Sequence, residues 1–145
     1  MDAPYGQVAL DTNQSIAFVT GDTSNTVAAV SYEDPQNPVV LGSVTDATSL
    51  NGVRGASYDS VNEVVIVAIN KDKGLAVVSV KNPNSMSVVG DVRGESTYMD
   101  GPIGICLNEN KSLAYVASYA SDSLAVVSYA DQANPTRIGG VADSL

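Results

Sequence analysis

The side chains that could do chemistry in this sequence are mostly carboxylates. Sixteen aspartates and glutamates stand against seven lysines and arginines, there is one cysteine, and histidine is absent. A Ser-His-Asp triad is therefore impossible, and so is a transition-metal site built from histidine or cysteine pairs. Carboxylates and tyrosines are the general bases that remain. We predict no catalytic residue, no metal site and no cofactor, and we expect that the chain is not an enzyme; a hydrolase or lyase that uses acidic groups and Arg54 stays as an alternative.

Calcium is the remaining metal to consider, because it takes oxygen ligands. Two sets of acidic or amide residues recur along the chain, one in short turns and one in longer connections: Asp11, Asp59 and Asn108, then Asp46, Asp100 and Asp143. Neither set has the dense acidic spacing of an EF-hand loop. Asp and Asn side chains often bond to the backbone of their own turn. We interpret both sets as turn-stabilising residues.

Four residues are candidates for a ligand-binding or partner-binding surface: Arg54, Tyr98, Asp100 and Tyr119. Arg54 stands beside Gly55 at the start of a strand-like run, where an arginine could hold an anion or a carboxylate. The alternative is a structural arginine that bonds the carbonyls of a neighbouring loop. Tyr98 and Tyr119 fall in connecting segments, and exposed tyrosines often mark contact surfaces.

The single cysteine, Cys106, lies in the apolar run IGICL at 103–107. A lone cysteine excludes an intrachain disulfide framework. A cysteine nucleophile usually needs a histidine to activate it, and this chain has none. We therefore expect Cys106 to be a small buried hydrophobic residue.

The net charge of −9 excludes two classes of partner. A nucleic-acid binder needs a basic stripe to displace counterions from phosphate, and an anionic membrane surface would repel an acidic chain. No segment approaches the roughly 20 apolar residues of a membrane span, and no signal peptide is visible. We expect no nucleic-acid partner and no membrane insertion.

The positions of the candidate residues depend on an internal repeat of about 48 residues. Ser31, Ser79 and Ser128 are equivalent in three aligned segments, and their spacings are 48 and 49 residues. A fixed period of this length indicates a propeller or a solenoid. The sequence divides into repeats at approximately 1–49, 50–98 and 99–145.

Each repeat contains four short strand-like runs, which in the second repeat are 55–58, 63–69, 75–80 and 87–92. The second and third runs are almost wholly apolar, which is typical of strands buried on both faces. They are too short and too rich in valine for helices, and turn residues such as Asp72-Lys73-Gly74 interrupt them. The valines expected to be nearly fully buried are Val65, Val67, Val77, Val78, Val116, Val126 and Val127.

Two segments carry a resemblance to known repeats. The run LAVVSV at 75–80 and the run DPQNPVVLG at 34–42 resemble the LVIVD repeat family, and FVT at 18–20 with SNTV at 24–27 is similar to the related YVTN repeats. The resemblance implies a β-propeller, a location that is extracellular or at the cell surface, and no shared catalytic motif. The second repeat departs from the pattern with NPNSM at 82–86. The predicted fold class is therefore all-β, with three tandem four-stranded antiparallel blades in a single propeller segment. In a propeller the first strand of each blade lines the central channel, and this places Arg54 there.

The two ends of the repeat array raise a physical problem. MDAPYG at 1–6 aligns with MDGPIG at 99–104, and 141–145 matches the connection that begins at Val44, so we expect three whole repeats divided within a connection between blades. Closed propellers have about four to eight blades, and open arrays need polar caps that this sequence lacks. We expect a second copy (giving six blades), the rest of a longer repeat chain, or another protein to cover the ends.

Three functional hypotheses follow. The first is a non-enzymatic interaction scaffold that binds proteins or glycans, because the architecture is repetitive and catalytic residue types are missing. The second is a structural subunit or fragment of a larger multi-chain assembly, because the outer blade faces lack caps. The third is the propeller hydrolase or lyase already mentioned.

Overall fold

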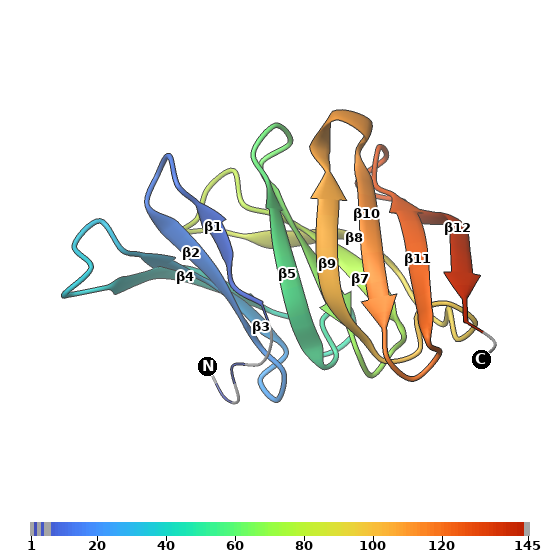
Figure 1. Ribbon diagram of the computed structural model, residues 1–145. Coiled ribbons are helices and arrows are strands. Elements are labelled where there is room, and N and C mark those ends of the chain that lie inside the picture. Colours follow the sequence, from blue (N-terminus) through green and yellow to red (C-terminus); the bar gives the residue numbers. More distant parts are fainter. Residues whose placement is uncertain (1, 3, 5–6, 144–145) are drawn as a thin grey trace.

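The computed structural model describes residues 2, 4 and 7–143. These residues form three antiparallel sheets, or blades, that are arranged side by side like a fan (Figure 1). Blade 1 holds β1 (Ala9–Asp11), β2 (Ile16–Gly21), β3 (Thr26–Ser31) and β4 (Val39–Thr45). Blade 2 holds β5 (Val53–Asp59), β6 (Val64–Ile69), β7 (Gly74–Ser79) and β8 (Ser87–Val92). Blade 3 holds β9 (Pro102–Asn108), the 3₁₀ turn η1 (Glu109–Lys111), β10 (Leu113–Ser118), β11 (Ser123–Ser128) and β12 (Thr136–Ala142). The predicted all-β fold class with three four-stranded blades is confirmed.

Local backbone geometry repeats with the sequence. Left-handed residues recur just before the second strand of each blade and again just before the third: Ser15, Glu63 and Ser112, then Asn25, Lys73 and Asp122. A positive φ lets these hairpins turn within a few residues. A register shift between the third and fourth strands also recurs at one repeat position, after Ala29, Val77 and Val126. The three blades are thus built on one backbone plan.

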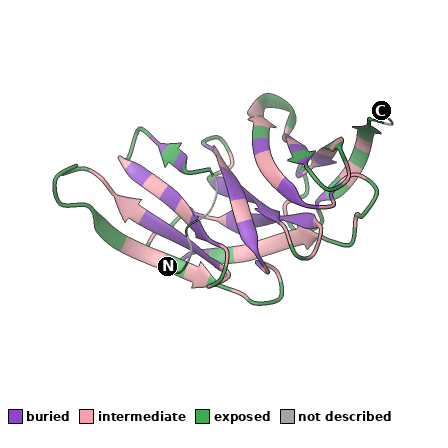
Figure 2. Ribbon diagram, turned by 60° about the horizontal axis from the view of Figure 1, so that its bottom comes forward, coloured by how far each residue is buried: buried purple, intermediate pink, exposed green. Residues whose placement is uncertain are grey.

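Two apolar clusters join the three blades. We call the side of a blade that points to the preceding blade its leading face, and the side that points to the following blade its trailing face. One cluster packs the trailing face of blade 1, with Phe18 and Val27, on the leading face of blade 2, with Val65 and Val67. The other packs the trailing face of blade 2 on the leading face of blade 3. Because both faces of blade 2 are covered, every residue of β6 is buried, whereas exposed and half-buried residues dominate the last strand near the C-terminus (Figure 2).

The predicted core valines are buried with one exception. Val65, Val67, Val77, Val78, Val116 and Val127 are inaccessible to solvent. The prediction for Val126 is wrong, because this residue is only half-buried. Val126 occupies the same repeat position as Val77 but lies on the trailing face of blade 3, where no further blade covers it.

The first strands of the three blades lie next to one another along the middle of the fan, with β5 in contact with β1 and β9 (Figure 1). The two strands approach closely at Gly55, where a Cβ atom would lie 1.9 Å from the carbonyl oxygen of Ile103. Only glycine permits this contact between strands of adjacent blades. Within the described part of the chain, no helix is long and apolar enough to cross a membrane.

Candidate functional site

The four candidate binding residues all lie at one edge of the fan, which we call the connection rim. It comprises the long connections 46–52 and 93–101, the beginnings of the first strands that follow them, and the hairpins between the second and third strands of each blade. Backbone bonds join the two kinds of segment, as from the Asp46 N–H to the Asn25 carbonyl and from the Gly94 N–H to the Asp72 carbonyl. In a four-stranded meander the fourth strand ends at the edge where the central hairpin turns. The up-and-down topology therefore gathers these residues.

Arg54 joins blade 2 to blade 1. Its Nε donates to Oδ2 of Asp22 at 3.0 Å, and Asp22 belongs to the β2–β3 hairpin of the preceding blade. Lys71 Nζ lies 3.5 Å from the other carboxylate oxygen of Asp22, while Thr20 Oγ1 donates to the Arg54 carbonyl. The arginine thus has a contact with the neighbouring blade, as the structural alternative expects, but its partner is a carboxylate. A ligand-binding role for Arg54 remains a prediction.

Tyr98 and Asp100 lie in the connection between β8 and β9 and are held by cations. Lys73 Nζ donates to Asp100 Oδ2 at 2.8 Å, which ties the connection to the β6–β7 hairpin. The guanidinium of Arg137 lies 4.8 Å from the centre of the Tyr98 ring and also donates to Glu95. These contacts order the connection.

Tyr119 is the most exposed of the four candidates, with 60% of its surface accessible. Its ring lies over Gly101, where a Cβ atom would come within 2.5 Å of the ring, and its N–H donates to the Gly101 carbonyl. The structure therefore brings Tyr98, Asp100 and Tyr119 to the same side of blade 3, whereas Arg54 sits at the junction between blades 1 and 2. Their joint role in binding stays a prediction.

A hollow of about 270 Å³ opens beside Tyr119 on the trailing face of blade 3. Ile103 and Gly104 of β9, Ala117 of β10 and Ser123 of β11 line it. We call it the blade 3 hollow. Sequence reasoning missed it, because it exists only where no fourth blade covers the third.

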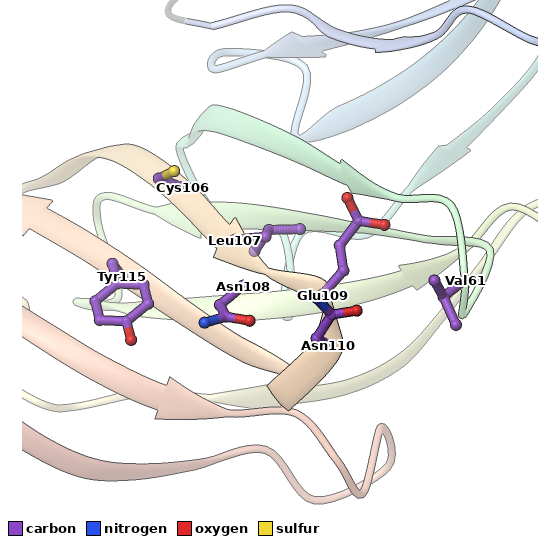
Figure 3. Close-up of a pocket in the computed structure, with 7 residues that line it drawn as sticks. All are labelled: Val61, Cys106, Leu107, Asn108, Glu109, Asn110 and Tyr115. Atoms are coloured by element: carbon purple, nitrogen blue, oxygen red, sulfur yellow. The ribbon is translucent and has the colours of Figure 1, made fainter.

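A second, larger hollow of about 540 Å³ lies at the opposite edge of the fan (Figure 3). Cys106 and Asn108 of β9 and Tyr115 of β10 line it, together with Glu109. The carboxylate of Glu109 accepts hydrogen bonds from the N–H and hydroxyl of Ser60 in blade 2. The prediction that Cys106 is buried is wrong, since the thiol is exposed. Alternate side chains of β9 point away from the blade 2 interface, and Cys106 is one of them.

Buried carboxylates link successive blades near this edge. Asp59 accepts hydrogen bonds from the Val61 and Asn62 N–H groups of its own turn and from the hydroxyl of Tyr129 in blade 3, at 2.8 Å. Burial opposes its negative charge, but the bonds from Asn62, Tyr129 and Val61 hold the pKa of Asp59 below its ordinary value. Among the described residues, no group of three or more His, Cys, Asp or Glu side chains could hold a metal ion.

At the junction between blades 1 and 2, another tyrosine hydroxyl donates a hydrogen bond to a carboxylate of the preceding blade. Tyr58 donates to Oδ2 of Asp11 at 3.1 Å, and burial together with this bond raises the pKa of Tyr58 to about 12. Tyr58 lies in the first strand of its repeat, whereas Tyr129 directly follows the third strand of its repeat. No periodicity could have paired them with their carboxylates, and sequence analysis missed both.

Comparisons with known proteins show the fold. No family model and no curated protein matches the sequence, so the likeness to LVIVD and YVTN repeats stays a resemblance. Solved structures do match: a candidate 6-phosphogluconolactonase from Bacteroides fragilis has a TM-score of 0.75 and 16% identity over 94% of this chain and 38% of its own. The Pseudomonas aeruginosa periplasmic gluconolactonase has a TM-score of 0.75 and 15% identity over 94% of this chain and 39% of its own. Hydrazine synthase from Kuenenia stuttgartiensis has a TM-score of 0.75 and 16% identity over 99% of this chain and 37% of its own.

These matches define the class of protein as β-propeller-like, and this chain spans about two fifths of the length of the structures that it matches. They also correct the expectation that the chain is not an enzyme. Proteins with the same fold are named gluconolactonases, so the fold is compatible with an enzyme. At this level of identity the likeness shows the fold and assigns no activity.

Proposed function

We propose that this chain is a three-blade segment of a β-propeller that serves as a binding scaffold, with its two outer blade faces covered by further blades. The observation that carries the proposal is that both outer faces repeat the apolar positions of the internal ones. On the trailing face of blade 3, Leu124, Ile138 and Val141 stand where blade 2 has Leu75, Val89 and Val92. Yet Ile138 is 59% and Val141 63% exposed.

The leading face of blade 1 repeats the pattern. Val19, Val30 and Val40 occupy the repeat positions of Val67, Val78 and Val88, which pack against blade 1 in the first cluster. Val19 and Val30 are half-buried and Val40 is exposed. Contiguous apolar faces of this kind mark interaction surfaces on soluble proteins.

The native mass of the chain tests the proposal. We expect sedimentation to show a mass that rises with protein concentration above the 14.9 kDa of one chain. The substitution Val141→Asp should weaken this association, whereas Val61→Asp, which changes an equally exposed valine in the β5–β6 turn, should not. A folded monomer over a wide concentration range would contradict the proposal.

Within this scaffold, the connection rim of blade 3 is the proposed contact surface for a protein or glycan. Its support is the exposed ring of Tyr119 beside the ordered connection that holds Tyr98 and Asp100. A glycan array gives a direct test, with Tyr119→Ala as the variant expected to lose binding. Equal binding by the variant and the unchanged chain would place the contact elsewhere.

Hydrolysis of a sugar lactone is a second candidate function, supported by the names of structures that share the fold. The cluster of Arg54, Lys71 and Asp22 brings two cations and a carboxylate together on the connection rim. We expect that, if this cluster acts in hydrolysis, Arg54→Gln would slow the cleavage of glucono-δ-lactone followed by proton release. No acceleration by the unchanged chain over buffer would dismiss this candidate without affecting the scaffold proposal.

A further inference from the structure

We propose that a second copy of this chain packs head-to-tail on the trailing face of blade 3, with the leading face of its first blade against that face. The proposal rests on the scaffold function above and names the partner that covers one outer face. Three features support the proposal. Each occurs at both internal junctions, and each lacks a covering blade on the trailing face of blade 3.

The first feature is the hollow itself. At both internal junctions, the segment that leads into a first strand covers the equivalent part of the preceding blade. Leu50 of segment 50–54 is buried in the cluster that holds Val27 and Phe18 of blade 1, and Met99 of segment 99–103 is buried in the cluster that holds Ala68 and Leu75 of blade 2. The blade 3 hollow, lined by Ala117 where blade 2 has Ala68, is the same place without its covering segment. Its volume of about 270 Å³ accommodates one large aliphatic side chain.

The second feature is a glycine in the fourth strand of every blade. A Cβ atom on Gly42 would lie 2.5 Å from the Pro83 carbonyl of blade 2, and one on Gly90 would lie 2.3 Å from the Gln132 carbonyl of blade 3. Each glycine thus receives the turn after the third strand of the following blade. Gly139 holds the same position in blade 3, and no atom lies within 4 Å of the place for its Cβ. A turn from another blade fits there.

The third feature is a side chain in the hairpin after the second strand. At both internal junctions this side chain forms a hydrogen bond with the next blade. Asp22 accepts from Arg54 of blade 2, and the Asn70 side chain donates to the Pro102 carbonyl of blade 3 at 3.3 Å. Tyr119 holds this position in blade 3 and is exposed.

The uncovered leading face of blade 1 carries the counterpart of the second feature. Pro35 stands at the repeat position of Pro83 and Gln132, and its turn touches no glycine of a preceding blade. Since one chain presents both halves of the junction, two copies can cover each other's outer faces through two equivalent contacts.

Steric variants on blade 3 test the inference. Gly139→Leu and Ala117→Trp should leave the far-UV circular dichroism and unfolding midpoint of the single chain unchanged, since both positions face open space, and should lower the association constant by about tenfold or more. Ala47→Trp, at an exposed alanine in the 46–52 connection, is the matched control and should associate like the unchanged chain. If the unchanged chain associates and both variants associate equally well, the inference is overturned and the scaffold proposal stands. If the unchanged chain is a folded monomer, both the inference and the scaffold proposal are wrong.

Mixing separates head-to-tail packing from other arrangements. Val40→Glu blocks the leading face of blade 1, and Gly139→Leu blocks the trailing face of blade 3. Each variant alone should associate at least about tenfold more weakly than the unchanged chain, while an equimolar mixture should form a heterodimer through the one junction that remains intact. Full association of Val40→Glu alone would show trailing faces packed on each other and would overturn the inference.

Discussion

Two valines at one repeat position offer a direct measurement of what blade packing contributes. Val77 and Val126 are equivalent, but Val77 is buried between blades 2 and 3, whereas Val126 is half-buried on the uncovered trailing face of blade 3. Val→Ala removes two methyl groups at about 0.8 kcal/mol each, and the cavity between packed sheets adds to this loss. We expect Val77→Ala to lower the free energy of unfolding by about 2–3 kcal/mol and Val126→Ala by about 1 kcal/mol or less.

Urea unfolding at low protein concentration measures both losses on the single chain. Repeating the measurement at high concentration adds a second readout, because association through the blade 3 face would bury Val126 and increase the effect of its truncation. Equal losses for the two valines at low concentration would refute the assignment of covered and uncovered faces. A harmless Val77→Asp change would refute the blade packing altogether.

Three further predictions concern the junctions between blades. Tyr129→Phe removes a donor to the buried carboxylate of Asp59 and should lower the free energy of unfolding by about 1.5–3 kcal/mol in urea titrations; a loss near zero would show that the bond adds nothing. Tyr58 has a folded-state pKa of about 12, above its unfolded value of about 10, so its contribution is complete below pH 10 and is lost as the pH rises toward 12. Tyr58→Phe should therefore make stability fall less steeply between these pH values, and an unchanged slope would contradict the assignment. Gly90→Val should abolish cooperative folding measured by circular dichroism, because its side chain would meet backbone 2.3 Å away, and a folded variant would contradict the close contact.

Much of the architecture could be predicted from residue order. The spacing of 48 and 49 residues, the apolar runs of β6 and β7 and the recurring turn residues predicted three four-stranded blades. These signals are local, because a strand, a hairpin and a left-handed turn depend on a few neighbouring residues. Even so, the left-handed position of the β6–β7 hairpin is Lys73 and not the adjacent Gly74, since hairpin geometry outweighs residue preference there.

The candidate site could be predicted only in part. Residue order placed Tyr98 and Tyr119 in connecting segments and Arg54 at the start of a strand, but it did not bring the four candidates to one edge. The partners of these residues come from other blades, as when Asp22 receives Arg54, and no pattern within a repeat specifies them. The expectation that the chain is not an enzyme was corrected by the names of structures that share the fold, which residue types alone could not supply.

The sequence by itself determined which side chains lie on each face of each blade, because alternation along a strand follows from the pleat. Only the tertiary structure decided which faces are covered. Val126 and Cys106 have apolar neighbours in sequence just as Val77 has, yet both reach solvent because no following blade packs over blade 3. Burial depends on what lies across the interface, and that is set by the packing of separate blades and not by the strand that carries the residue.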